Sequence, residues 1–276
     1  MNVFDQMLSQ YKAQSTDELL NATHQVMQQI TLAALYRAGF FSQAAFYGGT
    51  CLRIFYGLPR FSEDMDFSLL QPERTFKLEN YFSAITEEFE TLGRKVIITK
   101  KEKKSASQVE SAFLKDTTAV YDLKFTTDRS IKIKIEVDTN PPLGFITEHK
   151  LLLLPFSFMT RCYSLSDLYA GKMHAFLFRN WKNRVKGRDW FDFEWFVRHN
   201  TVFNLEHFNQ RAMQTGLAGE EQLSTRQFKA MLIEKIRQTN IDHVLADVRP
   251  FVQRPEALAI WSTDYFIQLV ELMRFE

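Results

Sequence analysis

The sequence predicts an α+β protein, in which an α/β half is followed by a helical half. Apolar residues recur at helical spacing over residues 17–38 and at strand spacing over residues 131–137. Beyond about residue 155, only helical patterns remain. We therefore expect two domains, an α/β core over residues 1–158 and a helical domain over residues 159–276.

The elements of the first half follow from local signals. The helix over residues 17–38 should end at Gly39, because glycine readily adopts the left-handed conformation that ends helices. A short buried strand, Phe46-Tyr47, precedes the glycine turn. The expected elements after this turn are a helix over 51–56, a strand over 65–70, a helix over 72–92, and strands over 96–99, 120–126 and 131–137. The expected helices of the second half cover residues 165–179, 189–198, 205–214, 227–237 and 263–275.

The composition limits the class of protein. Of the 276 residues, 45% are hydrophobic and 24% are charged, which predicts an ordinary buried core. The 26 phenylalanines predict extensive aromatic packing between helices. The net charge of +1 gives no global attraction to nucleic acid, so any polyanion site must be a local patch. Two cysteines without a CxxC pattern, and apolar runs too short to span a bilayer, lead us to expect a cytoplasmic protein without membrane contact.

The strongest local feature is a glycine turn followed by two aspartates. Gly48 and Gly49 allow a tight turn that exposes amide N–H groups at the start of a helix, and Thr50 adds a hydroxyl donor. Asp64 and Asp66 are two residues apart on a strand, so both carboxylates project from one face. Carboxylates this close repel each other unless a cation lies between them.

A phosphate-binding turn beside paired carboxylates indicates phosphoryl or nucleotidyl transfer, with Mg²⁺ (or Mn²⁺) at Asp64 and Asp66. Two solvated aspartates on a surface strand are the alternative. Strand, glycine turn, helix, loop and acidic strand follow one another in the order that the chemistry requires, which favours the metal site.

At this point the sequence resembles a known family. Gly48-Gly49-Thr50 with Leu52, and then Arg-Phe-Ser-Glu-Asp-Met-Asp-Phe over residues 60–67, resemble the AbiEii/AbiGii toxin family of polymerase-beta-like nucleotidyltransferases. The resemblance implies a catalytic core with a mixed sheet, a helical C-terminal half and an NTP as donor. It also implies a bacterial toxin–antitoxin or phage-defence system, with a cognate antitoxin protein as a partner. Some members transfer nucleotides to the 3′ end of tRNA. Ser62 joins the nucleotide-binding candidates Gly48, Gly49 and Thr50.

Two further segments match the family's motifs, residues 168–175 around Lys172 and residues 184–192. Lys172 falls in the middle of an apolar helical arc, so its side chain must extend to solvent or reach a buried anion. We favour contact with the donor phosphates, which makes Lys172 both a nucleotide-binding and a catalytic candidate.

Asp189 and Asp192 begin the next helix. Asp189 as the helix N-cap, with Asp192 in the first turn, would be ordinary helix chemistry. Alternatively, Asp189 supports catalysis and Asp192 contributes to nucleotide binding. An unpaired Asp189 on the apolar side would be costly, so Arg188 or a metal-bound substrate could pair with it.

A basic run separates these two segments. Its cations, with one tryptophan among them, could bind an RNA backbone and stack a base, although a solvated basic face is the alternative. The RNA-binding candidates are Arg179, Trp181, Lys182, Arg184, Lys186 and Arg188.

Enzymes of this kind usually require a third carboxylate to help activate the acceptor hydroxyl. Glu136 and Asp138 both lie on the polar face of the strand over residues 131–137, and we choose Glu136 because it is nearer the strand centre. Pairing with lysines on neighbouring strands is the alternative role.

Three classes of function remain. The first is a toxin-like nucleotidyltransferase that acts on tRNA or another RNA, which the basic run favours. The second modifies the hydroxyl of a small molecule or a protein. The third is a catalytically silent relative, against which the intact Asp64 and Asp66 pair argues.

Overall fold

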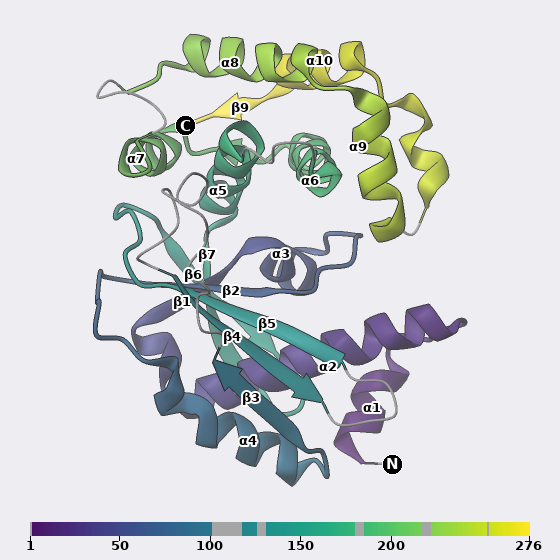
Figure 1. The fold of residues 1–276 in the computed structure, drawn as a ribbon, viewed down its shortest axis with the longest axis vertical. Helices are drawn as coiled ribbons and strands as arrows, with labels where there is room; N and C mark the ends of the chain where they lie inside the picture. Colours follow the sequence, from purple (N-terminus) through teal and green to yellow (C-terminus); the bar gives the residue numbers. More distant parts are fainter. Residues whose placement is uncertain (1, 101–117, 126–130, 180–184, 217–221, 253) are drawn as a thin grey trace. The chain divides into compact units, whose positions relative to one another are not determined.

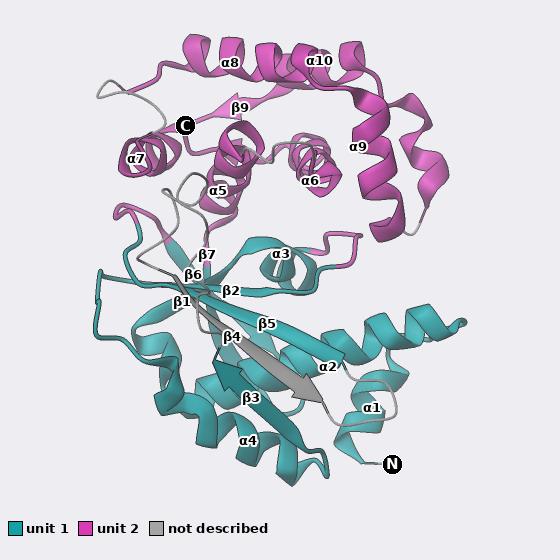
Figure 2. Cartoon of the chain, in the orientation of Figure 1, with its two compact units in different colours: residues 1–56, 62–141, 147–162 teal, residues 57–61, 142–146, 163–276 magenta. Residues whose placement is uncertain are grey.

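The computed structural model describes residues 2–276 except 101–117, 126–130, 180–184, 217–221 and 253 (Figure 1). The chain divides into two compact units, each with its own core (Figure 2). Unit 1 consists of Met1–Tyr56, Ser62–Pro141 and Thr147–Cys162. Unit 2 consists of Gly57–Phe61, Pro142–Ile146 and Tyr163–Glu276. Unit 2 thus takes two short segments from the N-terminal part of the chain.

Unit 1 is built on a mixed sheet. Within the described residues, seven strands pair in the order β3-β4-β5-β2-β1-β7-β6. The pairs β1–β7 and β2–β5 are parallel, whereas β1–β2, β3–β4 and β4–β5 are antiparallel. The predicted mixed sheet is therefore confirmed. The strands are β1 (Ala44–Tyr47), β2 (Met65–Leu69), β3 (Val96–Lys100), β4 (Thr118–Phe125), β5 (Ile131–Asp138), β6 (Thr147–Leu152) and β7 (Phe158–Tyr163).

The alternation of β5 fixes which side of the sheet is buried. Ile131, Ile133, Ile135 and Val137 are buried, and the charged residues between them are partly or fully exposed, as the period of two predicts. In the parallel pair of β2 and β5, Asp66 lies opposite Glu136, and Ser68 lies opposite Asp138. The strand register therefore brings Glu136 beside Asp66.

The helices of unit 1 begin with α1 (Val3–Ser9) and α2 (Thr16–Arg37). The Ser15 side chain caps α2 by accepting the Glu18 N–H, and Gly39 follows α2 in the left-handed region as expected, with φ of 74°. The remaining helical segments are η1 (Phe40–Ser42), α3 (Gly48–Tyr56), η2 (Leu78–Tyr81) and α4 (Phe82–Thr91).

The helix predicted over residues 72–92 is wrong in its first part. The Glu73 N–H donates to the carbonyl oxygen of Thr139 at 2.9 Å, which ties this segment to the end of β5 as a loop. Strands β6 and β7 were also not predicted, because the apolar residues of β6 do not alternate with polar ones in the way that marks a half-buried strand.

Unit 2 is mainly helical. Its helices α5 to α8 are Leu165–Phe178, Gly187–Arg198, Leu205–Gln214 and Thr225–Gln238, and α9 and α10 are Ile241–Val248 and Thr263–Leu272. The short helices η3 and η4 cover Arg249–Phe251 and Pro255–Ile260, and strands β8 (Val202–Phe203) and β9 (Arg274–Phe275) pair in parallel.

The core of unit 2 is aromatic, as the phenylalanine content predicted. Tyr169 stacks on Phe196 with ring centroids 4.3 Å apart, and Phe203 packs against Phe228 at 4.6 Å. Across both units, none of the helices in the described parts of the chain combines the length and apolar character needed to cross a membrane.

Candidate active site

Gly48 leaves room for the carboxylate of Asp66. Strand β1 ends at Tyr47, which pairs with Asp66 of β2, and α3 begins at the next residue. Gly48 has φ of 82°, and a Cβ at this position would lie 2.2 Å from Asp66 Oδ2. Any larger residue would therefore suffer both backbone strain and a collision with this oxygen. The glycine that sequence analysis assigned to a phosphate-binding turn also determines where Asp66 lies.

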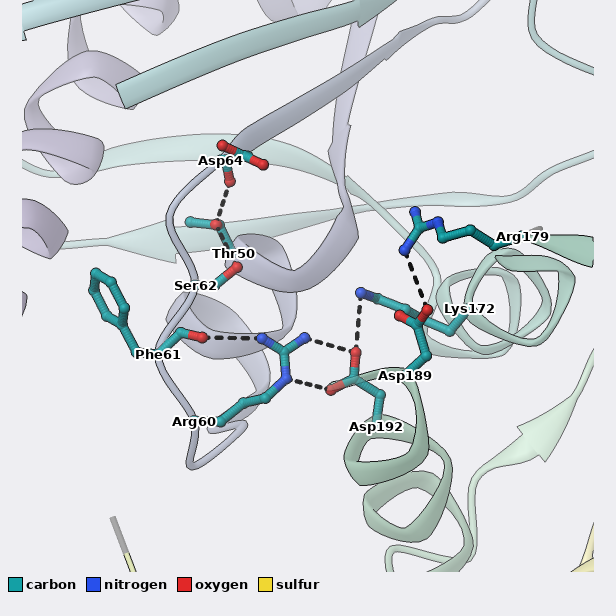
Figure 3. A network of polar contacts seen from close by, with 9 residues as sticks. All are labelled: Thr50, Arg60, Phe61, Ser62, Asp64, Lys172, Arg179, Asp189 and Asp192. Carbon is teal, nitrogen blue, oxygen red and sulfur yellow. Dashed lines mark hydrogen bonds and ion pairs between the residues drawn. The ribbon is translucent and has the colours of Figure 1, made fainter. Parts of the chain in front are cut away.

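Thr50 holds the segment that carries Asp64. Its side chain is fully buried, its hydroxyl donates to the carbonyl oxygen of Asp64, and its Oγ1 lies 3.0 Å from the Ser62 hydroxyl (Figure 3). From α2, Gln28 Nε2 donates to the carbonyl oxygens of Ser62 at 3.1 Å and Glu63 at 3.0 Å. Gln28 is fully buried, and sequence analysis did not identify it. Two helices therefore hold the backbone just before β2.

Three carboxylates lie on one face of the sheet of unit 1. Asp64 directly precedes β2, Asp66 lies two residues further along, and Glu136 lies opposite Asp66 on β5. Lys134 on β5 forms an ion pair with Glu136. Burial opposes the charge of Lys134, but Glu136 and then the charges of Asp64 and Asp66 keep its pKa above the ordinary lysine value. This cluster attracts positive charge.

Asp138, the other candidate for the third acid, lies opposite Ser68. Its Oδ1 accepts the N–H of Asn140 at 3.0 Å, which stabilises the turn after β5. Of the two candidates, Glu136 is the one opposite an aspartate of the pair.

The described residues contain no group of three or more His, Cys, Asp or Glu side chains arranged to hold a metal ion. Asp64 and Asp66 nonetheless suit magnesium, which takes one or two carboxylates and completes its shell with substrate phosphates and water. Both are partly exposed, and their oxygens are the hard ligands that this ion prefers.

Unit 2 contains a buried ion network centred on Asp192. Arg60 Nε and Nη2 donate to Asp192 Oδ1 and Oδ2 at 2.6 and 2.7 Å, and Lys172 Nζ lies 2.9 Å from Oδ2 (Figure 3). The Asp192 side chain is fully buried and that of Arg60 is 3% exposed. Burial alone would raise the pKa of Asp192, but Arg60 and then Lys172 lower it to about 2.

This network identifies the partner of Lys172 and adds Arg60, a residue that was not predicted. Lys172 does reach a buried anion, as its place on the apolar arc required, and in the structure this anion is Asp192. Arg60 was not identified, although it stands at the start of the segment that carries the family resemblance. Arg60 also contacts the next residue of the chain, because its Nη1 donates to the carbonyl oxygen of Phe61 at 3.0 Å.

The N-cap role considered for Asp189 is wrong. Helix α6 begins at Gly187 with Lys186 as its cap residue, so Asp189 lies inside the first turn. The buried Asp189 carboxylate pairs with Arg179 Nη1 at 3.1 Å (Figure 3). The Arg188 guanidinium, suggested as its partner, lies 4.1 Å above the Phe251 ring.

The described members of the basic run surround the start of α6. Burial, together with the positive charges of Arg179, Lys172 and Arg188, lowers the pKa of Lys186 to about 8, even though Asp189 opposes the shift. These cations therefore influence one another within unit 2. Trp181, Lys182 and Arg184 lie outside the described residues.

A mixed sheet that carries paired aspartates on a strand next to a glycine turn, followed by a helical half, is the arrangement expected of a polymerase-beta-like nucleotidyltransferase. The family model for the nucleotidyl transferase AbiEii toxin of type IV toxin–antitoxin systems matches residues 30–268. The chain belongs to this family, and the resemblance found in the sequence is confirmed.

Solved structures show a similar fold. JHP933 from Helicobacter pylori is 17% identical, with a TM-score of 0.56 over 95% of this chain and 91% of that protein. A candidate nucleotidyltransferase from the same organism is 18% identical, with a TM-score of 0.51 over 94% of this chain and 93% of that protein. At these identities the likeness shows the fold alone. A search of curated proteins found no match.

Proposed function

We propose that this nucleotidyltransferase is magnesium-dependent and transfers a nucleoside monophosphate from an NTP to the 3′ end of tRNA, as the toxin of a toxin–antitoxin or phage-defence system. The observation that carries the proposal is the set of three carboxylates, Asp64, Asp66 and Glu136, on the sheet face next to the Gly48 turn. This arrangement suits the transfer of a charged phosphoryl group to a hydroxyl.

Asp64 and Asp66 would hold the metal ion. When bound, Mg²⁺ (or Mn²⁺) would neutralise charge on the donor phosphates and polarise the phosphorus that is attacked. Lys134 already lies beside these carboxylates, and its positive charge limits their mutual repulsion when no metal is bound. We assign this lysine a supporting electrostatic role.

The donor phosphates would meet the backbone amides at the start of α3, where Gly48 and Gly49 have no side chain to obstruct an anion. Thr50 and Ser62 take a positioning role, because both are buried and the Thr50 hydroxyl already donates to the backbone carbonyl oxygen of Asp64. We retain Lys172 as a phosphate-binding residue, since Nζ has three N–H donors and its pairing with Asp192 leaves others for an anion. Asp192 and Asp189 would orient Lys172 and Arg179 respectively.

In the reaction, the acceptor oxygen attacks the α-phosphorus of the NTP and pyrophosphate leaves with the bonding electrons. Glu136 would accept the proton of the acceptor hydroxyl, because it lies beside Asp66 and its orientation is fixed by Lys134. This step conserves charge and requires no further reactant.

The proposed acceptor is RNA, bound by the basic run that includes Arg179, Lys186 and Arg188 together with Trp181, Lys182 and Arg184. The number of cations in this short segment supports a polyanion partner, because RNA phosphates would be bound by several of them at once. A cognate antitoxin protein is the second proposed partner, in keeping with the family. Modification of a small-molecule or protein hydroxyl is the alternative function.

The experiment is incubation of the pure protein with each α-³²P-labelled NTP, Mg²⁺ and total cellular RNA, followed by gel separation. We expect one NTP to label RNA of tRNA length. Glu136→Gln should slow labelling by about a hundredfold or more, because general base catalysis contributes about 10²–10⁴-fold. Asp138→Asn is the matched control, since it removes a carboxylate charge two residues away on the same strand face.

Labelling of a protein or a small molecule, with none of RNA, would favour the alternative acceptor. Equal slowing by Glu136→Gln and Asp138→Asn would show that Glu136 has no particular part in the transfer.

A further inference from the structure

Unit 2 contains a pocket with a volume of about 700 Å³. It is lined by α6, by Gly57 and Pro59, and by residues between Val252 and Leu258. None of the residues assigned above to the metal, the donor or the basic run lines it. Its volume lies within the range of about 300–1,000 Å³ that is typical of small-molecule sites.

One wall of the pocket is a row of aromatic rings. Phe191, Trp195 and His199, the residue that follows α6, are spaced at intervals of four residues, so their side chains lie on one side of this helix and its C-terminal end. Trp195 and His199 stack with their centroids 4.3 Å apart and their planes inclined by 30°. His199 Nδ1 lies 2.7 Å from the carbonyl oxygen of Trp195, which fixes the imidazole in this position. His199 is exposed and Phe191 is half-buried, whereas Trp195 is buried, so the aromatic surface that this wall offers to a ligand is mainly the His199 ring, held in place by Trp195.

The charged groups of the pocket favour an anion. Arg198 and Arg254 are exposed, the side chain of Arg198 to 68%. The acid on this wall, Glu194, is buried, and its two oxygens accept the Trp261 Nε1–H at 2.8 Å and the Tyr265 hydroxyl at 2.6 Å. Its nearest contact with Arg198 is 3.7 Å, so most of the five N–H donors of Arg198 remain available to a ligand.

We propose that this pocket binds a nucleoside monophosphate unit, with the base against the His199 and Trp195 wall and the phosphate at Arg198 and Arg254. Any of the four bases can stack on an aromatic ring, and the guanidinium group of arginine forms charge-assisted hydrogen bonds with phosphate oxygens. The source is either one nucleotide of a bound RNA or a free nucleotide. The first source rests on the proposed function, because it requires RNA as the acceptor.

The test uses a fluorescent single-stranded RNA oligonucleotide that carries 5-iodouridine, with the full-length chain. Anisotropy measures RNA affinity, and photo-crosslinking followed by mass spectrometry locates the base. We expect crosslinks on Phe191, Trp195 or His199, and about tenfold weaker binding for His199→Ala, since base stacking is worth about 1–3 kcal/mol. The double variant Arg198→Ala/Arg254→Ala should weaken binding at least as much.

Arg226→Ala provides the matched control, because Arg226 is an exposed arginine on α8 that does not line the pocket. The unfolding midpoint of all variants should equal that of the wild type, so that a change in affinity reports the pocket and not the fold. A second arm replaces the oligonucleotide with uridine monophosphate. If the monophosphate binds in the pocket and the oligonucleotide does not, the source is the free nucleotide.

Affinity for both probes that is unchanged in the pocket variants would overturn the proposal. Oligonucleotide crosslinks that map only outside residues 191–199 would exclude RNA as the source, and would overturn the proposal if the pocket variants also leave the affinity for uridine monophosphate unchanged. The pocket would then be left for a protein partner. If the protein transfers no nucleotide to RNA but the crosslinks still map to this wall, the proposed acceptor is wrong and the pocket assignment stands.

Discussion

The buried ion network of unit 2 allows a comparison between two substitutions, each of which removes one of the two cations that pair with Asp192. Arg60→Met and Lys172→Met each remove one cation from Asp192 and leave an apolar chain of similar length. Arg60 supplies two hydrogen bonds and is almost fully buried, whereas Lys172 supplies one and is 17% exposed. Removing one partner of a buried ion pair costs about 3–5 kcal/mol. We expect a loss in this range for Arg60→Met, and a smaller loss of about 1.5–3 kcal/mol for Lys172→Met, the scale of one hydrogen bond to a charged group.

The pH dependence of folding stability gives a second measure of how strongly the network stabilises the protein. The network lowers the pKa of Asp192 from 3.8 to about 2, a change equivalent to about 2 kcal/mol of folding stability. Because the folded-state pKa is depressed, this stability is fully present above pH 3.8 and is lost as the pH falls towards 2. In Arg60→Met, burial opposes the charge with only Lys172 to offset it, so acid should destabilise the variant at a higher pH than the wild type.

The assay is urea unfolding followed by tryptophan fluorescence at pH 7 and at pH 4. All four tryptophans belong to unit 2, so this signal reports the unit that contains the network. Lys172→Met should also weaken NTP binding if this lysine contacts the donor phosphates. Equal losses of stability for the two variants, or a wild-type acid profile in Arg60→Met, would refute the reasoning.

Three further predictions concern the glycine turn, the Thr50 contact and the basic run. Gly93→Ala should lose about 1–2 kcal/mol of stability, because this position is left-handed and a Cβ there would meet no atom within 4 Å. Gly48→Ala should lose at least as much and should also abolish transfer, because its Cβ would collide with Asp66 as well. Thr50→Val should destabilise unit 1 by about 1–3 kcal/mol in urea unfolding and lower transfer, because a buried carbonyl loses its donor, whereas Thr50→Ser should retain both. A salt titration of tRNA affinity should show a steep fall, about 0.7 in log–log slope per phosphate contact, and a flat response would contradict the RNA acceptor. This slope should be smaller for the variant in which Lys182, Arg184 and Lys186 are all replaced by alanine.

The parts of the fold that could be predicted are those with local causes. The alternation of β5 decides its buried face without reference to any other segment, and the helical spacing over residues 17–38 together with Gly39 delimits α2 within a few residues. The pairing of β7 with β1 depends instead on a long-range contact, Phe46 with Cys162, which no local pattern indicates. Helix α9 was not predicted either, because its apolar residues follow helical spacing over only eight residues, which is too short a stretch to distinguish a helix from sequence alone.

In the candidate site, too, contacts between residues far apart in the sequence could not be predicted. A charged residue in a loop is normally solvated, so Arg60 gave no signal, and its partner Asp192 lies 132 residues further along the chain. Sequence spacing could suggest Asp189 and Asp192 as candidates, but it could not assign their cations. The structure pairs Asp189 with Arg179 and Asp192 with both Arg60 and Lys172.

The residues of the glycine and aspartate segments divide into two kinds according to what their atoms already do. Thr50 and Gln28 are fully buried, and their hydrogen bonds go to the backbone of residues 62–64 and to the Ser62 hydroxyl. They therefore act by fixing the position of Asp64. Asp64 and Asp66 are partly exposed, so a ligand can reach their carboxylates. Gly48 belongs to both kinds, because its missing side chain accommodates Asp66 while its helix start can bind an anion. Substitution of a buried member should therefore reduce transfer together with stability, whereas substitution of Asp64 or Asp66 should abolish transfer and leave the unfolding midpoint close to that of the wild type.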